Sequence, residues 1–507
     1  MTVPQPISPR SGHRYLNTPW ATTSDLYSPP GSLIVKLALG EAPERIPALL
    51  DVRRKVVPAA VATSVGSVDR LLHHFSDDVK VMRLYSAAAN RNTPGQRHQH
   101  FDDVEHALGM SRTFRLEASK DASVDDLVSA LRQLAVVEQA YPNYLTTLPF
   151  ESGDGADSGQ FSEQNLDAAW RSREMVKLKA ALAFEAGDPS IIVGVADTGV
   201  KQTHPEIEKR LRVGIDTVQL STTSMSAGVQ LLGDFRRMDT DPEDMVGHGT
   251  ACAGIIGALG THGPPGLAGD CRIFPARVLG AAVFPGKDVP VGIGAIADID
   301  VGMKMCIDLG VKVINMSFGT PESLLDPNDP LPHEDVVRYG LARGCVMIAA
   351  SGNSGRIERF SPACLSGVIA VGAVDEKRHP TAFSTRGDHV ALCAPGVEIF
   401  SAGLNGYQRV TGTSFAAPFV TATAALLVSH AARHAYPLDS PTIRRVLIRS
   451  AQRWHSAEAK GMGHGAGIVD AYAALQALDE EIARNRAMED SEDDDDRAHT
   501  QRARRDV

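Results

Sequence analysis

The sequence predicts two folded units: a small α+β domain with a ferredoxin-like topology, followed by a larger α/β domain. We expect the larger domain to be a three-layer, doubly wound sandwich around a mostly parallel sheet. The whole chain has 507 residues, more than one ordinary domain contains. Short strands and amphipathic helices mix before about residue 150, whereas nearly continuous apolar runs alternate with helical patterns after about residue 163.

The apolar runs of the larger domain are typical of strands buried on both faces of a parallel sheet. They alternate with helical patterns, as a doubly wound sandwich requires. In such sheets, functional residues gather where strands end in loops. The four clearest runs are Ile191–Ala196, Val311–Met316, Cys345–Ala350 and Val368–Gly372.

The N-terminal unit contains alternating segments that fit half-buried strands. The best helix covers Ser123–Leu134, with Ser123 as its N-cap and one apolar face. The order of strands and helices indicates the ferredoxin-like topology. The expected strands are Ser32–Leu39, Val79–Leu84, Thr113–Glu117 and Val136–Ala140.

Composition shifts set the expected boundaries. Residues 1–30 are rich in Pro, Ser and Thr and are expected to be a flexible arm. The small domain spans 31–148, and a Gly/Ser/Asp-rich linker at 149–162 offers a region for cleavage. The main domain covers 163–478, and an acidic tail at 479–507 is expected to be disordered.

Charge and cysteine usage exclude several classes of protein. The net charge of −10, without a basic stripe in the central region, argues against a nucleic-acid partner. No run of about 20 apolar residues suggests a membrane span. The N-terminus lacks the apolar core of a secretory signal, so we expect a cytoplasmic protein, with release by a non-classical route as the open alternative. The six cysteines form no CxxC pair, so buried, reduced thiols are expected.

Four residues in separate short motifs have the chemistry that amide hydrolysis needs. Asp197 follows a buried strand, and His248 lies between two glycines at the start of a small-residue helix. Ser414 begins another such helix, whose free N–H groups favour negative charge. Asn353 lies in a Gly-flanked loop after a strand, where its amide could donate to an oxyanion.

Each of these residues also has an ordinary structural interpretation. Asp197 fits a turn and Ser414 an N-cap, while Asn353 fits an Asn-Gly-type turn. A lone histidine is usually a satisfied core or surface residue, but the flanking glycines of His248 argue against that here. The combination and the chain order decide in favour of a catalytic set.

With these motifs, residues 163–478 resemble the subtilisin family (subtilases), in which the order is Asp, His, Ser. The resemblance implies a serine endopeptidase that forms an acyl-enzyme on Ser414. His248 would be the general base and acid, and Asp197 would orient it. The Asn353 side chain and the Ser414 backbone N–H would hold the oxyanion.

The resemblance also implies a substrate cleft and an inhibitor. Ser317, Phe318 and Gly319 resemble the strand that pairs with a substrate backbone, and Ala350, Ser351 and Gly352 would form the opposite wall of the first specificity pocket. Residues 136–144 resemble the end of an inhibitor-like propeptide, so a zymogen with its own N-terminal domain as intramolecular inhibitor is expected. A permanent regulatory domain is the alternative.

No cofactor is predicted. Many secreted subtilases bind calcium near the segment that here reads His204-Pro-Glu206, together with an Asn-bearing loop. The corresponding loop at 260–266 has no Asn and few oxygen donors, whereas calcium takes six to eight oxygens, so the usual site looks absent. A catalytically silent, peptide-binding homologue with a plugged cleft is the rival hypothesis. It would be marked by a lost triad residue or Asn, and neither is lost.

Overall fold

The computed structural model describes residues 15–16, 29–41, 43–90, 93–148, 163–222, 225, 228–454 and 462–503. Within this part of the chain a central sheet has the strand order β18-β17-β15-β13-β7-β10-β8, with neighbouring strands parallel. The predicted parallel α/β sheet is confirmed. Its strands are β7 (Ile192–Asp197), β8 (Ile215–Asp216), β10 (Arg272–Arg277), β13 (Val313–Met316), β15 (Val346–Ala350), β17 (Ile369–Val374) and β18 (Val390–Pro395).

Helices cover the central sheet as two packed pairs. One pair is α7 (His248–Gly257) with α10 (Thr413–Arg433), and the other is α8 (Ile296–Asp308) with α9 (Glu334–Ala342). Helix α10 is long and apolar enough to cross a membrane, but 89% of its most apolar window is buried inside the protein. It is the core helix of the domain.

The N-terminal unit has an antiparallel sheet with the order β3-β4-β2-β5. This is the predicted ferredoxin-like arrangement. Ser123 caps α4 by accepting a hydrogen bond from the Asp126 N–H, as its position predicts. The elements are β2 (Ser32–Leu37), α1 (Leu49–Arg53), α2 (Gly66–Phe75), β3 (Lys80–Arg83), α3 (Asp103–Ala107), β4 (Thr113–Glu117), α4 (Val124–Leu131) and β5 (Val137–Pro142).

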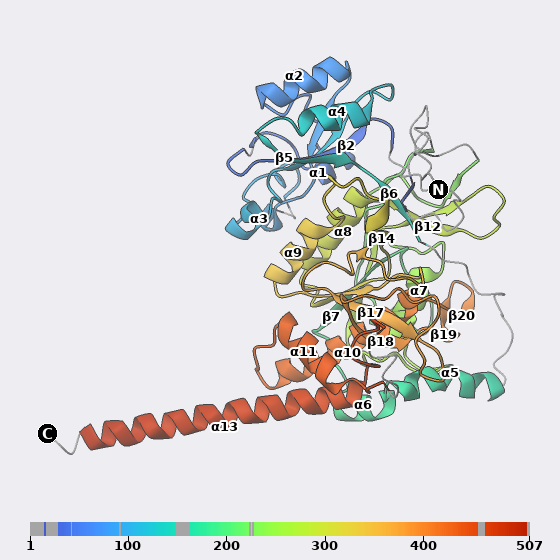
Figure 1. Cartoon of the computed structure of the whole chain (residues 1–507), viewed down its shortest axis with the longest axis vertical. Coiled ribbons are helices and arrows are strands. Elements are labelled where there is room, and N and C mark those ends of the chain that lie inside the picture. Colours follow the sequence, from blue (N-terminus) through green and yellow to red (C-terminus); the bar gives the residue numbers. More distant parts are fainter. Residues whose placement is uncertain are drawn as a thin grey trace.

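The N-terminal unit lies against α8 and α9 (Figure 1). Charged pairs hold the two together. Arg115 Nη1 lies 2.9 Å from Asp298 Oδ1, and Lys304 Nζ lies 2.6 Å from Glu105 Oε1. The side chains of all four residues are buried. Removing Arg115 would leave the buried Asp298 carboxylate without its ion-pair partner, so this pair in particular fixes the orientation of the domain.

A mixed sheet, not predicted from the sequence, links the two units. Its order is β1-β6-β12-β11-β9, and β6 pairs antiparallel with β12. Strand β6 directly follows β5, so the last segment of the N-terminal unit becomes part of a sheet of the main domain. The strands are β1 (Tyr15–Leu16), β6 (Leu145–Thr147), β9 (Gln230–Leu232), β11 (Gly280–Val283) and β12 (Val291–Ala295).

The C-terminal boundary differs from the prediction. Helix α13 runs from Ala471 to Ala503, across the expected domain end at residue 478 and into the tail expected to be disordered. Leu475, Leu478 and Ile482 form a buried face of this helix, spaced as an amphipathic helix requires, so the domain continues past 478. The expected linker at 149–162 lies outside the described residues, as does most of the expected arm at 1–30.

The remaining elements are short connections and peripheral helices. They are α5 (Glu163–Met175), α6 (Leu178–Phe184), α11 (Ser440–Ser450), β14 (Thr320–Pro321), β16 (Phe360–Ser361), β19 (Ile399–Gly403), β20 (Gly406–Val410), and the 3₁₀ turns Ala88–Asn90, Glu208–Arg210 and Glu322–Leu324.

Candidate active site

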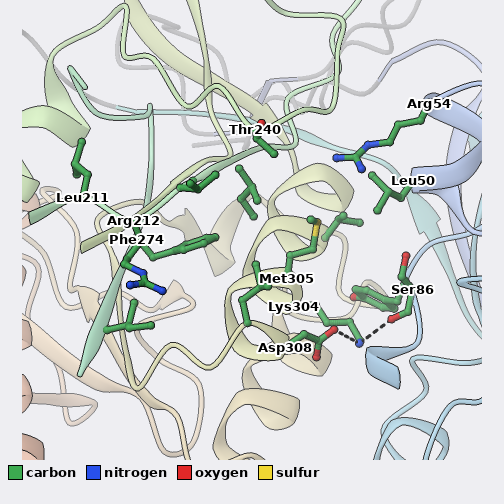
Figure 2. Close-up of a pocket in the computed structure, with 17 residues that line it drawn as sticks. Leu50, Arg54, Ser86, Leu211, Arg212, Thr240, Phe274, Lys304, Met305 and Asp308 are labelled. Atoms are coloured by element: carbon green, nitrogen blue, oxygen red, sulfur yellow. Dashed lines mark hydrogen bonds and ion pairs between the residues drawn. The ribbon is translucent and has the colours of Figure 1, made fainter. Parts of the chain in front are cut away.

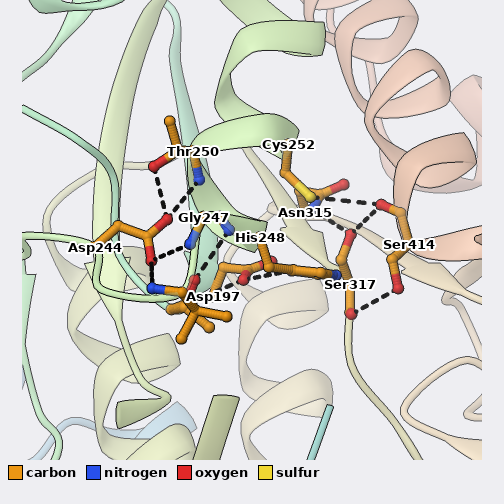
Figure 3. Close-up of polar contacts among 12 residues, drawn as sticks. Asp197, Asp244, Gly247, His248, Thr250, Cys252, Asn315, Ser317 and Ser414 are labelled. Atoms are coloured by element: carbon orange, nitrogen blue, oxygen red, sulfur yellow. Dashed lines mark hydrogen bonds and ion pairs between the residues drawn. The ribbon is translucent and has the colours of Figure 1, made fainter. Parts of the chain in front are cut away.

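Three of the predicted residues lie at the ends of core elements. Asp197 ends β7, His248 begins α7 and Ser414 is the second residue of α10. His248 Nδ1 lies 2.7 Å from Asp197 Oδ1, and both side chains are buried. In Figure 3 the imidazole lies between Asp197 on one side and Ser317 and Ser414 on the other. The Asp197 contact places the proton on Nδ1, which leaves Nε2 as the basic nitrogen of the neutral ring.

A second buried carboxylate, Asp244, fixes the loop that carries His248. Its Oδ1 accepts hydrogen bonds from the N–H groups of Val246 and Gly247. Its Oδ2 accepts from the N–H and the hydroxyl of Thr250. Burial raises the pKa of Asp244, and these four donors oppose that rise. The carboxylate therefore spans the residues on both sides of His248 and holds the start of α7 in place.

A glycine at position 249 is required by close packing. A Cβ atom there would lie 2.2 Å from the carbonyl oxygen of Gly199 and 3.0 Å from Cβ of Asp197. Any larger residue would push α7 away from β7 and would lengthen the contact between His248 and Asp197. Glycine, which has no Cβ, allows this close approach of the two backbones.

Because residue 418 is a proline, the carbonyl oxygen of Ser414 accepts its hydrogen bonds from outside helix α10. In a regular helix that oxygen would accept the N–H of residue 418, but proline has none. Instead the Ser317 hydroxyl donates to it at 2.7 Å, and the thiol of Cys252 lies 3.5 Å away. The Ser414 hydroxyl donates to the Ser317 carbonyl oxygen at 3.1 Å. The start of α10 is thus joined to the end of β13 in both directions.

Asn353 is held by the same helix start. Its Oδ1 accepts the Thr413 N–H at 3.0 Å and the Thr413 hydroxyl at 2.9 Å. These two bonds turn the amide oxygen toward Thr413, so the NH₂ group points away from Thr413. A cavity of about 110 Å³ lies beside it. The cavity is lined by Ser317, Phe318, Gly319, Ala350, Gly352, Asn353, Ser354, Phe360, Thr413 and Ser414.

The structure thus brings five of the six predicted substrate-binding residues to one cavity that also contains Asn353 and Ser414. Ser351 is the exception. It is fully buried, and its hydroxyl donates to the Thr385 carbonyl oxygen at 3.0 Å. Ser351 directly follows β15, and this hydrogen bond holds its side chain in the core, whereas its neighbours Ala350 and Gly352 line the cavity.

Comparison with known proteins identifies the family. The subtilase family model matches residues 188–469, more than half of the chain. This chain belongs to the subtilase family. It is 34% identical over 316 residues to the thermophilic serine proteinase of Bacillus sp. (strain AK1), covering 61% of this chain and 68% of that protein. It is 30% identical over 302 residues to thermitase of Thermoactinomyces vulgaris, covering 59% of this chain and 94% of thermitase.

A solved structure of a protease from Pseudoalteromonas arctica PAMC 21717 superposes with a TM-score of 0.50. The alignment covers 62% of this chain and 98% of that structure, at 23% sequence identity, and it supports the fold alone. The family matches confirm the predicted subtilisin-like serine peptidase class and the α/β fold. They imply protein or peptide substrates.

In this subtilase the edge of β12 is covered by β6. The Leu148 N–H donates to the Gly292 carbonyl oxygen at 2.8 Å, next to the paired residues of β6 and β12. A Cβ atom on Gly292 would lie 2.7 Å from the Thr198 methyl and 2.8 Å from a Leu148 methyl. Leu148 therefore reaches the residue that follows Asp197. The chain segment after β5 runs along the main domain to the immediate vicinity of the Asp-His pair.

Cys252 is buried beside the Asp-His pair. Burial raises the pKa of its thiol well above the ordinary value, and the nearby Asp197 carboxylate raises it further. Since the thiolate is the reactive form, the thiol stays protonated and inert at neutral pH. This agrees with the prediction of a buried, reduced thiol.

The region of the usual calcium site is organised around a carboxylate. Glu206 accepts the N–H groups of Gly260, Thr261 and His262 and the hydroxyl of Tyr407. Burial alone would raise the pKa of Glu206, but these donors hold it below its ordinary value. The loop turns N–H groups toward Glu206, whereas calcium needs oxygen ligands. The Glu206 carboxylate therefore holds the loop at residues 260–262 in place.

A larger cavity of about 590 Å³ lies at the junction of the N-terminal unit and the main domain. Figure 2 shows Leu50, Arg54 and Ser86 of the N-terminal unit facing Phe274, Met305 and the Lys304–Asp308 pair. It contains none of the predicted catalytic or substrate-binding residues. Cavity size alone would therefore misplace the active site of this subtilase.

Sequence reasoning missed two supporting residues. Asp244 holds the His248 loop, and its only local signal is its position four residues before the histidine. Asn315 donates to the Ser317 hydroxyl at 2.8 Å and accepts from Thr421 at 3.0 Å. It lies inside an otherwise apolar strand, and a polar residue there predicts a buried hydrogen-bond partner.

Proposed function

We propose that this chain is a serine endopeptidase that hydrolyses protein or peptide substrates through an acyl-enzyme on Ser414. His248 would take the hydroxyl proton from Ser414 as its oxygen attacks the scissile carbonyl carbon. It would then give that proton to the leaving amine, and water would hydrolyse the ester by the same steps in reverse. Asp197 would stabilise the imidazolium that forms between these steps.

The oxyanion of each tetrahedral intermediate needs donors that are already in place. Asn353 is suited to this because Thr413 holds its Oδ1 and so aims its NH₂ group. The Ser414 N–H is the second candidate donor. It belongs to the first turn of α10, where N–H groups lack partners within the helix.

We further propose that the protein is made as a zymogen whose N-terminal domain occupies the cleft. The observation that carries this proposal is the pairing of β6 with β12, continued by the bond from Leu148 to Gly292. A substrate that adds a strand to an exposed sheet edge binds through such backbone hydrogen bonds. The edge of β12 lies beside Thr198, the residue after Asp197, and would serve as such an edge. The chain's own segment occupies it, so a substrate that bound there would have to displace that segment.

The test is the intact mass of the purified wild-type chain beside Ser414→Ala, each measured fresh and after incubation. Self-cleavage predicts that the wild type loses roughly 150 N-terminal residues, as the domain boundary implies, and that the variant stays intact. Processing of both proteins to the same extent would assign the cleavage to another protease. A fluorophosphonate probe, which labels a competent serine, should label the wild type and not Ser414→Ala. Absence of labelling after removal of the N-terminal domain would contradict the enzymatic proposal.

A permanently attached regulatory domain is the second candidate role for residues 31–148. The buried pairs Arg115–Asp298 and Lys304–Glu105 favour it, because they would hold the domain in place even after the chain is cut. Gel filtration of the cleaved protein separates the two roles. A propeptide elutes apart from the catalytic domain on dilution, whereas a regulatory domain elutes with it and inhibits until it is displaced.

A further inference from the structure

A cluster of metal-ligand side chains lies at the C-terminal end of α10, away from the proposed active site. His430 is on α10, His434 is the C-cap residue of α10, with its N–H bonded to the His430 carbonyl oxygen, and Asp479 is on α13. One ligand atom from each lies within 4.8 Å of the others. His430 Nε2 is 3.0 Å from Asp479 Oδ1, and the two imidazole centroids are 4.6 Å apart.

The spacing of these atoms fits a tetrahedral metal ion. Residues four apart on a helix lie on the same face, so His430 and His434 present both rings to α13. Zinc binds imidazole nitrogen at about 2.0–2.1 Å, which places two ligands of a tetrahedral site about 3.3 Å apart. His430 Nε2 and Asp479 Oδ1, 3.0 Å apart, are close to that separation, and all three ligand atoms lie within 4.8 Å of one another. Two imidazoles and one carboxylate, with a fourth position for water, form a ligand set that zinc accepts.

The surroundings of His430 supply the outer support that such a site needs. Metal-bound histidines usually donate their other ring N–H to a carboxylate. His430 Nδ1 faces Glu185 Oε2 at 3.6 Å. Glu185 is buried and is fixed by the Gly187 N–H and by Arg433. The Phe184 ring covers His430, with the two ring centroids 5.4 Å apart.

We propose that His430, His434 and Asp479 bind one zinc ion, with Glu185 orienting His430 from outside the coordination shell. The ion would clamp α13 to α10, and through Glu185 to the end of α6. Sixteen residues of helix separate His430 from Ser414, or about 24 Å at 1.5 Å per residue. The proposed ion is therefore structural and takes no part in peptide hydrolysis.

The experiment uses the untagged full chain carrying Ser414→Ala, which prevents self-digestion, after treatment with a chelator. Zinc is titrated by calorimetry, and thermal unfolding is followed with and without it. We expect one equivalent of zinc per chain and a higher unfolding temperature. Adding His434→Gln should abolish both effects while leaving the His430–Asp479 contact intact. Glu185→Gln should weaken zinc binding by about 10–100-fold, as loss of an outer carboxylate does.

The matched control is His379→Gln, because His379 is an exposed histidine four residues after Asp375, with the two side chains 3.8 Å apart. It should bind zinc like the parent. Equal binding by His434→Gln and the parent would overturn the proposal and would assign the zinc to other residues, such as the acidic run at 489–496. If the parent shows no saturable zinc binding, the cluster is an ion pair and not a metal site. If circular dichroism shows that His434→Gln is misfolded, Asp479→Asn repeats the test from the other helix.

Discussion

Replacing Asn353 with alanine tests the oxyanion assignment most directly. The change removes the amide NH₂ group proposed to donate to the oxyanion, and loss of one such donor lowers kcat about 10²–10³-fold. It also removes Oδ1, which accepts two bonds from Thr413. Because Thr413 precedes Ser414, its release would loosen the helix start that carries the nucleophile. We therefore expect the larger end of that range, about 10³-fold in kcat, with little change in KM.

A matched variant separates the donor from its support. Thr413→Val removes only the hydroxyl that bonds Asn353 Oδ1 and keeps the backbone N–H that also bonds it. A neutral hydrogen bond contributes about 1 kcal/mol, so the amide should lose part of its orientation and kcat should fall about 5-fold. The two variants therefore bracket the contribution of an oriented donor.

The assay is steady-state hydrolysis of a chromogenic peptide by the N-terminally processed enzyme, with active sites titrated by a fluorophosphonate. Circular dichroism of each variant checks that the fold is kept. A loss confined to KM would remove Asn353 from the oxyanion role and assign it to ground-state binding. A kcat within a few-fold of wild type would refute the oxyanion role of Asn353.

Three further outcomes follow from the buried polar groups. Glu206→Gln should lower the free energy of unfolding at pH 7 by about 2 kcal/mol, since it loses charge-assisted hydrogen bonds. Hydrogen-bond donors hold the folded-state pKa of Glu206 below its ordinary 4.5. Its contribution to stability is therefore present above pH 4.5 and is lost as the pH falls through the folded-state pKa. In urea titrations at pH 7 and pH 4, the variant should lose less stability on acidification than the wild type. Asp244→Asn should lower kcat at least 10-fold, because an amide NH₂ would face N–H donors and displace the His248 loop. The pH–rate profile should shift with it, and an unchanged profile would exclude a positioning role. Arg115→Met should lower the free energy of unfolding by about 3–5 kcal/mol, because it leaves Asp298 buried without its partner. Burial raises the pKa of Asp298 to about 6, although Arg115 opposes that rise. Adding Asp298→Asn should restore much of that loss in thermal unfolding, and additive losses would contradict the pairing.

The elements predicted well are those whose signal is local. Strand β4 has the predicted bounds, Thr113–Glu117, and Ser123 caps α4. Alternation and capping are properties of adjacent residues, so the sequence displays them directly. The Asp197, His248 and Ser414 motifs are also local, because each combines a strand end or helix start with small residues. His248 contacts Asp197 at the end of β7, and Ser414 is joined to Ser317 at the end of the neighbouring strand β13, because the strand ends of a parallel sheet lie at one edge.

The features missed depend on distant partners. The residue types at 145–147 do not predict their pairing with residues 293–295, because this pairing uses backbone hydrogen bonds that any residue type can make. Asp244 likewise bonds mainly to backbone N–H groups, so its sequence context resembles a surface turn. Helix α13 was not predicted because charge dominates the composition of the last residues. The spacing of Leu475, Leu478 and Ile482 is a local signal for a helix, and these three buried side chains attach the N-terminal part of α13 to the core.

The β6–β12 pairing has a consequence for how activity would depend on concentration. If residues 145–148 occupy the cleft as proposed, that segment is tethered while the chain is uncut, and a short tether gives an effective concentration on the order of mM. A substrate at µM concentration then competes poorly even if it binds as well. Once the chain is cut, the same contacts become bimolecular, and dilution favours release. The buried Arg115–Asp298 and Lys304–Glu105 pairs would slow that release without strengthening the cleft contacts. The processed enzyme should therefore regain activity on dilution, with a lag that shortens in Arg115→Met.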